Sequence, residues 1–333
     1  MKEIIIDDKL SGQKLVRCLE KYLANAPKSF IYKMLRKKNI TLNNGKANGD
    51  EKLKTGDSIK IYFSEETLCK FTSKDSAAER DDYYSRIYQP LDILYEDTDM
   101  IFINKPSGML SQKAAENDIS LIEYLTAYLI HNNQITPEEL ASFRPGVCNR
   151  LDRNTSGIVA AGKTTKGLQE LSAVFRDRNL GKYYICIVNG CISKRALIKG
   201  FITKDVHSNK VTVLKHETKN SLPIETEYIP VCGNEHVTLL KIHLLTGRSH
   251  QIRAHLASIG HSLIGDYKYG QKSINDKFSR KYGVKDQLLH SYELIIPDRS
   301  IHIYAGIPDI FTKVMKGEHL CQPGIQEVLE AQH

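Results

Sequence analysis

The stretch of residues 149–162 constrains this chain more than any other part of it. It reads Asn-Arg-Leu-Asp-Arg-Asn-Thr-Ser-Gly-Ile-Val-Ala-Ala-Gly and sets one carboxylate, Asp152, between Arg150 and Arg153. The Asn-Thr-Ser-Gly segment is typical of a turn, and the apolar residues after it predict a buried strand. Arginines this close favour the ionised form of a carboxylate. We therefore expect an anionic Asp152 at the mouth of a strand, where it can act as a nucleophile or a base.

The composition bounds the class of protein. The chain has 333 residues, of which 41% are hydrophobic, and this is enough for two domains with a substantial core. No apolar run approaches the roughly 18 residues of a membrane-spanning helix, and the first residues do not resemble a signal peptide. The seven cysteines are scattered without a Cys-x-x-Cys pair, which argues against a disulfide framework or a zinc knuckle. We expect a cytoplasmic protein without a membrane partner.

The positive charge of the chain is concentrated at its N-terminus. Of the net charge of +8, residues 1–62 carry +7, from fourteen Lys and Arg against seven Asp and Glu, and the rest of the chain carries only +1. A small basic unit ahead of a nearly neutral body indicates a polyanionic partner. A well-solvated surface is the alternative.

The first 63 residues predict a small α+β module. Apolar spacing indicates helices over about 13–23 and 30–38, followed by a strand at 40–42, an Asn-Asn-Gly hairpin turn and a strand from 58. This order resembles the S-four-type RNA-binding domain. The resemblance implies that the basic side of the second helix contacts the RNA backbone through Lys33, Arg36, Lys37 and Lys38. A merely solvated helix face is the alternative.

The remaining chain predicts a linker, a large domain and a tail. Residues 64–88 are polar and charged, so we expect a linker with one helical turn. The large domain, 89–315, contains strands at 93–97, 100–103, 182–188, 225–229 and 237–244, and apolar helices after residues 120 and 164. We expect an α+β fold with a mixed, mainly antiparallel sheet, and a hairpin at Asn189-Gly190. Residues 316–333 carry no motif.

Two further stretches carry chemistry. In the strand at 182–188, alternation places Tyr183 and Tyr184 on opposite faces. Residues 245–260 predict a helix that Ser249 caps and Gly260 ends. The histidines in that stretch, His250 and His255, are five residues apart and lack the His-Glu-x-x-His pattern, so we expect no metal site.

Four segments, taken in order, resemble motifs of the RluA family of pseudouridine synthases. Residues 149–157 match His-Arg-Leu-Asp-Arg/Lys-Asp-Thr-Ser-Gly except at Asn149 and Asn154. Residues 104–108 match Asn-Lys-Pro-x-Gly, and residues 182–190 match Lys-x-Tyr-x-x-x-Val-x-Gly. Residues 246–255 match Thr-Gly-Arg-Thr-His-Gln-Ile-Arg-x-His except at Ser249.

The resemblance implies conversion of uridine to pseudouridine in structured RNA, an isomerisation that needs no cofactor. It implies that Asp152 is the reacting carboxylate and that Arg253 pairs with it. It also implies that Tyr184 stacks on the uracil and is a candidate for taking the proton from carbon 5. Arg150 would fill the space that the extruded base leaves. The remaining motif residues that we assign to substrate binding are Arg153, Lys182, Arg248, His250 and Gln251.

Several alternatives remain at this point. Large-subunit ribosomal RNA is the expected substrate and transfer RNA the second candidate. A non-catalytic RNA-binding protein of ribosome assembly is another class, against which the Asp152, Tyr184 and Arg253 set argues. A glycoside hydrolase needs two carboxyl groups flanking one bond, and Glu96, Asp97 and Asp266 lie in no motif that suggests such a pair.

Overall fold

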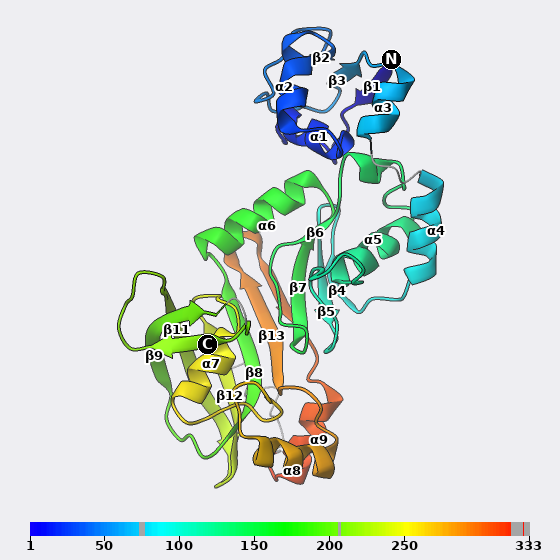
Figure 1. Cartoon of the computed structure of the whole chain (residues 1–333). Coiled ribbons are helices and arrows are strands. Elements are labelled where there is room, and N and C mark those ends of the chain that lie inside the picture. The colour runs from blue at the N-terminus through cyan, green and yellow to red at the C-terminus, as the bar shows by residue number, and fades with distance from the viewer. Residues whose placement is uncertain (73–76, 206–207, 321–328, 330–333) are drawn as a thin grey trace. The chain divides into compact units, whose positions relative to one another are not determined.

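The computed structural model describes residues 1–72, 77–205, 208–320 and 329. Figure 1 labels its helices and strands. The chain divides into two compact units. The first holds Met1–Ile103, Ser111–Arg150 and Val159–Ala173, and the second holds Asn104–Leu110, Leu151–Ile158 and Val174–His333. The short segments matter, because they place the Asn-Lys-Pro segment and the Asp152 loop in the same unit as Tyr184 and Arg253.

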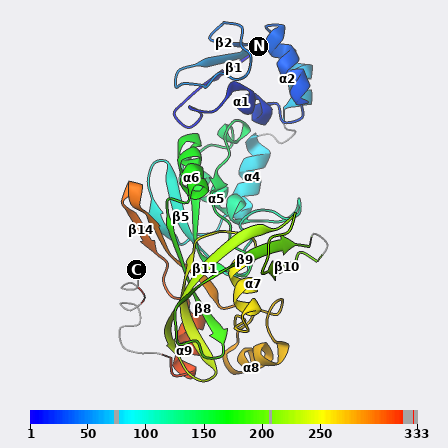
Figure 2. The same ribbon diagram turned by 90° about the vertical axis from the view of Figure 1, so that its left-hand side faces the viewer.

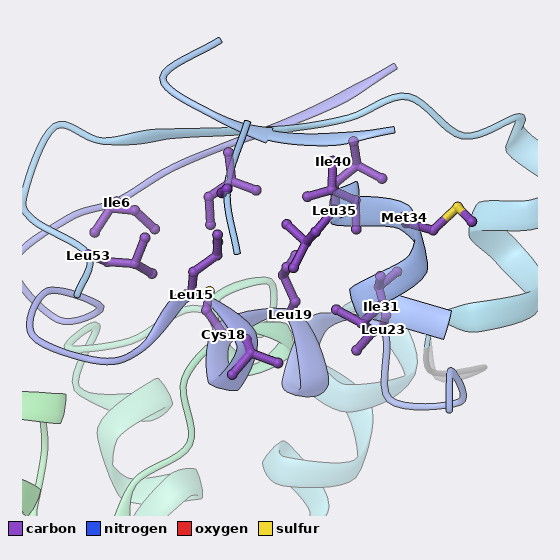
Figure 3. Packing of buried hydrophobic residues seen from close by; sticks show 14 of the residues in the cluster. Ile6, Leu15, Cys18, Leu19, Leu23, Ile31, Met34, Leu35, Ile40 and Leu53 are labelled. Carbon is purple, nitrogen blue, oxygen red and sulfur yellow. The ribbon is translucent and has the colours of Figure 1, made fainter. Parts of the chain in front are cut away.

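The N-terminal module is built from helices α1 (Leu15–Tyr22) and α2 (Lys28–Arg36) and a three-stranded antiparallel sheet. The strands are β1 (Lys2–Ile5), β2 (Ile40–Leu42) and β3 (Ser58–Ile61), with β3 in the centre. Figure 3 shows side chains of both helices pointing toward the sheet, among them Leu15, Leu19 and Ile31. The helices and strands that the apolar spacing predicted here are therefore confirmed, within a residue or two at their ends.

The Asn-Asn-Gly turn after β2 has the predicted local geometry but a different partner. Asn43 and Asn44 have φ of 49° and 60°, and the amide and carbonyl groups of Leu42 and Gly45 bond to each other. Such a turn normally joins two paired strands. Here the residues after the turn pair with β2 only at the Leu42–Gly45 bridge, and the strand partner of β2 is the later strand β3.

The expectation of one helical turn within 64–88 was wrong, because the described residues of this range form two helices. Helix α3 (Glu65–Phe71) starts at Ser64, whose hydroxyl accepts a bond from Thr67 N. Leu68 and Phe71 pack on the core of the N-terminal module, with the Phe71 ring 4.4 Å from that of Phe30. Helix α4 (Ala77–Ile87) buries none of its residues, so its composition resembles that of a linker.

The rest of the first unit contains two strand pairs and two long helices. Strand β4 (Ile93–Glu96) pairs with β5 (Met100–Lys105) around an acidic turn, as predicted, and β6 (Gly146–Val147) pairs with β7 (Ser156–Gly162). Helix α5 (Leu121–His131) begins with a capping box of Ser120 and Glu123, and α6 (Thr165–Asp177) follows Thr164, whose hydroxyl accepts from Gly167 N. A short 3-10 turn, Glu139–Ala141, lies between them.

The second unit is organised around an antiparallel sheet in the order β10-β9-β11-β12-β8-β13. These strands are β8 (Gly181–Asn189), β9 (Ala196–Lys204), β10 (Val211–Leu214), β11 (Leu222–Gly233), β12 (Val237–Leu244) and β13 (Leu289–Ile296). The start of β7 runs parallel to β13, and β14 (Ile301–Tyr304) pairs with β13 beyond the 3-10 turn Pro297–Arg299. The mixed, mainly antiparallel α+β fold is confirmed. The hairpin expected at Asn189-Gly190 is not formed, because β8 lies between β12 and β13.

Three helices complete the second unit. Helix α7 (Gln251–Ser258) packs on β9, β10 and β11 through Ala254 (Figure 2). Helices α8 (Lys272–Tyr282) and α9 (Asp309–Gly317) cover β8 and β12 with Phe278, Tyr282 and Phe311. Helix α9 crosses the predicted domain end at 315, and most of the predicted tail lies outside the described residues. Within the described ranges, no helix combines the length and apolar character that a membrane crossing requires.

Candidate active site

The loop that carries Asp152 is held by a close approach between two strands. Thr155 N donates to Asp152 O at 3.0 Å and closes the predicted turn. Two residues later Gly157 has φ of 110°, and a Cβ there would lie 2.2 Å from Ser291 O on β13. Only glycine fits this combination of backbone angle and contact. The glycine of the motif therefore lets β7 meet β13 directly after the carboxylate.

Asp152 is paired with Arg253 of α7. Arg253 Nη1 donates to Asp152 Oδ2 at 2.8 Å, and the Asp152 side chain is 25% exposed, which leaves it accessible to a ligand. Burial opposes the charge of Arg253, but the bonded carboxylates of Asp266 and Asp152 outweigh burial and raise the pKa of the guanidinium above its ordinary value. Arg253 therefore stays positively charged and remains hydrogen-bonded to Asp152.

Asp266 holds the other edge of the same guanidinium. Arg253 Nε and Nη2 donate to its two oxygens at 2.7 and 2.9 Å, which is a bidentate pair. Backbone amides of Lys268 and Tyr269 also donate to Asp266 Oδ1. In the sequence, Asp266 is only an acid without a motif. The signal that could have found it is the buried arginine, because a buried cation needs a buried counter-charge.

The arginines beside Asp152 do not form its ion pair. Arg153 is exposed, and Arg150, which belongs to the first unit, is exposed as well. We expected these neighbours to stabilise the ionised form of Asp152, but the hydrogen-bonded cation beside it is Arg253. Asn149, where the family more often has His, accepts a bond from Ala160 N at 2.7 Å and so ties the start of the loop to β7.

His250 lies beside the same carboxylate. Its Nε2 is 3.9 Å from Asp152 Oδ2, and its Nδ1 is 2.8 Å from the hydroxyl of Tyr269. Burial lowers the pKa of His250, with Asp152 acting in the opposite direction. The cap expected at Ser249 is wrong, because His250 stands at the cap position of α7 with φ of 54°.

Gln251, Arg248 and Lys182 surround this turn in different ways. Gln251 is buried and bonds to Thr246, Thr226, Glu225 O and Arg248 N, so it braces the turn and has no open side toward a ligand. Arg248 Nε, in contrast, is buried without a hydrogen-bond partner among the described residues. Lys182 Nζ lies 3.5 Å from where a Cβ of Gly247 would stand, and burial lowers its pKa.

Tyr184 and Tyr183 occupy opposite faces of β8, as alternation predicted. Tyr184 is buried and lies in register with Ser291 of β13 and Ile242 of β12. Burial raises the pKa of Tyr184 to about 12, Ser291 lowers it by a hydrogen bond, and Asp152 raises it further. Tyr183 stacks on His243 with 4.6 Å between ring centroids. The charge of Asp152 thus acts on the pKa of Tyr184, as it does on that of Tyr269.

A buried lysine, Lys105, joins the Asn-Lys-Pro segment to the Asp152 loop. Its Nζ donates to the carbonyls of Pro106 and Met109 at 2.8 Å and to that of Arg153 at 3.1 Å. Gly108 N also donates to Arg153 O. Burial lowers the pKa of Lys105 to about 8, against the charges of Asp152 and Asp286. The Asn-Lys-Pro motif contains Lys105 but does not by itself predict this role.

The remaining predicted site residues are on the N-terminal module. Lys33, Arg36, Lys37 and Lys38 are all exposed. Over the residues that the structure describes, no three His, Cys, Asp or Glu side chains gather as a metal site would need. His255 is buried on α7 and bonds to Thr226 Oγ1 at 3.0 Å.

Comparison with known proteins gives one consistent result. Residues 99–258 match the RNA pseudouridylate synthase family. A protein of Vibrio parahaemolyticus named ribosomal large subunit pseudouridine synthase C is 30% identical over 321 residues, covering 94% of this chain and 95% of that protein. An uncharacterised RNA pseudouridine synthase of Mycoplasma pneumoniae is 33% identical over 282 residues, covering 83% of this chain and 82% of that protein.

The fold agrees with this result. The structure of the human protein RNA pseudouridylate synthase domain containing 4 matches with a TM-score of 0.57 at 18% identity. The match covers 73% of this chain and 97% of the human chain. The family assignment rests on the 30% identity to the Vibrio protein, which extends over 95% of that protein, and the shared fold agrees with it. The chain belongs to the RluA family of pseudouridine synthases and is an isomerase that acts on uridine in RNA.

Proposed function

We propose that this enzyme modifies uridines of large-subunit ribosomal RNA in the cytoplasm and that Asp152 is its reacting carboxylate. The observation that carries the catalytic part is the chain of bonds Asp152–Arg253–Asp266. A partly exposed carboxylate next to a guanidinium that a second, buried carboxylate holds rigidly is an oriented and charged group. The substrate part rests on relatives whose names specify the ribosomal large subunit.

The chemistry exchanges one glycosidic bond for another. The bond between the anomeric carbon and nitrogen 1 of uracil breaks, a bond from the anomeric carbon to carbon 5 forms, and the proton on carbon 5 is lost while nitrogen 1 gains one. Asp152 either attacks the anomeric carbon or removes the neighbouring 2′ proton. In both routes the uridine must first leave its helix, at a cost of a few kcal/mol.

The residues around Asp152 take the parts that their positions allow. Tyr184 stacks on the extruded uracil. Since its pKa is raised to about 12, its phenol is protonated at neutral pH, which favours stacking and hydrogen bonding over removal of the carbon 5 proton. Arg153, Lys182 and Arg248 supply positive charge for the phosphates of the RNA. Arg150 fills the space that the base leaves.

The N-terminal module, as an S-four-type domain, holds the RNA backbone. Its exposed Lys33, Arg36, Lys37 and Lys38 are placed for phosphate contacts that add affinity without reading sequence. Ribosomal RNA is favoured over transfer RNA because the similar proteins with specific names act on the large subunit.

The substrate is tested by mapping pseudouridines in cells with and without this gene, by carbodiimide-dependent stops of reverse transcription. Wild type, Asp152→Asn and the exposed control Asp298→Asn are each returned to the deletion strain. We expect stops in large-subunit RNA that vanish on deletion and return with wild type and Asp298→Asn only. Stops that change only in transfer RNA would refute the substrate, and stops restored by Asp152→Asn would refute the reacting residue.

A further inference from the structure

The contacts of Asp152 within the second unit converge on one of its two oxygens. Arg253 Nη1 bonds to Oδ2 at 2.8 Å, and His250 Nε2 faces the same Oδ2 at 3.9 Å. The Arg253 hydrogen bond draws electron density to Oδ2, and the imidazole approaches the same oxygen without a direct hydrogen bond, so Oδ1 is left as the better base or nucleophile. Arg253 on α7 and His250 at its cap therefore make the two oxygens of the Asp152 carboxylate inequivalent.

The side chain that orients His250 is Tyr269. Its hydroxyl lies 2.8 Å from His250 Nδ1 and also accepts a bond from Val211 N at 2.9 Å. Its ring lies 5.2 Å from the guanidinium carbon of Arg253, within the range of a cation–π contact. Tyr269 thus touches both groups that face Asp152 Oδ2, and it is anchored to β10 through Val211.

One hydrogen bond, to Tyr269, and one nearby charge, that of Asp152, favour one tautomer of His250. The carboxylate of Asp152 only accepts hydrogen bonds, so the ring nitrogen that faces it is best protonated. A neutral imidazole then has an unprotonated Nδ1, which must receive the Tyr269 O–H. The Tyr269 oxygen accepts from Val211 N with a lone pair, and its own proton remains available to donate to Nδ1.

We propose that Tyr269 is a positioning residue that acts through His250: its O–H fixes the Nε2-protonated imidazole against Asp152 Oδ2 and leaves Oδ1 as the oxygen that reacts. This inference rests on the proposed role of Asp152. The charged groups that face His250 are Asp152, Arg253, Lys268 and Asp266. Neutral imidazole is consistent with them, because the desolvation of the ring and the two cations oppose a further positive charge.

The tautomer is tested directly by nitrogen-15 NMR of the histidine rings at neutral pH. The signals of His250 are assigned by their loss in His250→Asn, since asparagine tolerates the positive φ of this position. We expect wild type to show a neutral ring protonated at Nε2, and Tyr269→Phe to show a mixture of tautomers. A wild-type ring protonated at Nδ1, or a Tyr269→Phe spectrum identical to wild type, would overturn the proposal.

The catalytic consequence is tested by a double-mutant cycle of Tyr269→Phe and His250→Asn. The rate measured is that of a single turnover on large-subunit RNA from the deletion strain. Tyr269→Phe should lower this rate roughly three- to tenfold, the effect of one hydrogen bond, with unchanged RNA affinity. In the His250→Asn background it should change nothing further. Equal losses in both backgrounds would show that Tyr269 does not act through His250.

A matched control is available two residues away. Tyr267 is half-exposed, and its hydroxyl bonds to Asp276 on α8, so Tyr267→Phe should leave the His250 signals and the rate unchanged. The two proposals fail in different ways. Turnover by Asp152→Asn contradicts the proposed function, whereas an additive cycle together with an inactive Asp152→Asn contradicts only the role of Tyr269.

Discussion

At the scale of single residues, the candidate site is a row of alternating charges in which Arg253 lies between the carboxylates of Asp266 and Asp152. Asp266 is buried and fully used by Arg253 and two backbone amides. Arg253 in turn donates from Nη1 to Asp152. The motifs predicted a pair of Asp152 with Arg253, and these side chains are hydrogen-bonded, but the motifs pointed to neither Asp266 nor Lys105. The spacing of apolar residues indicates which positions are buried. It does not indicate which buried charged side chains pair with each other.

Removing the charge of Asp266 tests whether it holds Arg253. Asp266→Asn leaves a buried cation with half of its partners, and breaking such a pair costs roughly 3–5 kcal/mol of unfolding free energy. We expect urea unfolding to show this loss and the single-turnover rate to fall while RNA affinity is kept. Asp276→Asn on α8, whose carboxylate bonds to Tyr267, is the matched control. A stable and fully active Asp266→Asn would contradict the role.

The buried histidine His255 makes stability depend on pH. Burial lowers its pKa from 6.5 to about 4 in the folded protein. Between these values the unfolded chain binds the proton and the folded chain does not, so stability is full above pH 6.5 and falls as pH decreases toward 4. The loss is at most about 3 kcal/mol. We expect His255→Gln to flatten the dependence of unfolding free energy on pH in this window, and an unchanged slope would contradict the assignment.

At the scale of elements, the site depends on where β7, β13 and α7 begin. The turn after Asp152 and the buried strand after it were predictable, since the turn residues and the apolar run are local signals. The parallel contact between Gly157 and Ser291 was not, because it joins residues far apart in the chain. Local signals also misplaced the start of α7, where a left-handed His250 stands instead of a capping Ser249.

The approach of β7 to β13 is tested with an alanine. Gly157→Ala combines φ of 110° with a Cβ 2.2 Å from Ser291 O, a backbone atom that cannot move aside easily. Backbone strain alone costs roughly 1–3 kcal/mol, and the overlap adds to it. Gly260→Ala is the control for strain, since φ is 89° and its Cβ would meet nothing within 4 Å. Equal unfolding free energies for the two variants would show that the overlap has no effect.

At the scale of the whole molecule, the sequence predicted the α+β class, the basic N-terminal module and the family. These follow from periodicity, charge distribution and contiguous motifs. Helices α3 and α4 were missed because a helix with little buried surface has the composition of a linker. The placement of 104–110 and 151–158 with the second unit also exceeds local reasoning, since it depends on contacts such as that of Lys105 with Arg153 O.

The basic module is tested by neutralising charge without removing residues. Changing Lys33, Arg36, Lys37 and Lys38 to Gln should weaken RNA binding and reduce the slope of log affinity against log salt by about 3, with the single-turnover rate at saturating RNA unchanged. The control changes four exposed basic residues of the second unit, Lys272, Lys277, Arg280 and Lys313. Equal slopes for the two quadruple variants would contradict a specific role of the module.

The most direct test of the central claim is single-turnover pseudouridine formation by Asp152→Asn on large-subunit RNA from the deletion strain. The substitution keeps the size of the side chain and removes its charge. We expect the rate to fall at least roughly a thousandfold, as it does when a reacting group is removed from other enzymes, while RNA affinity stays within about twofold. Turnover by Asp152→Asn within about tenfold of wild type would show that another group does the chemistry.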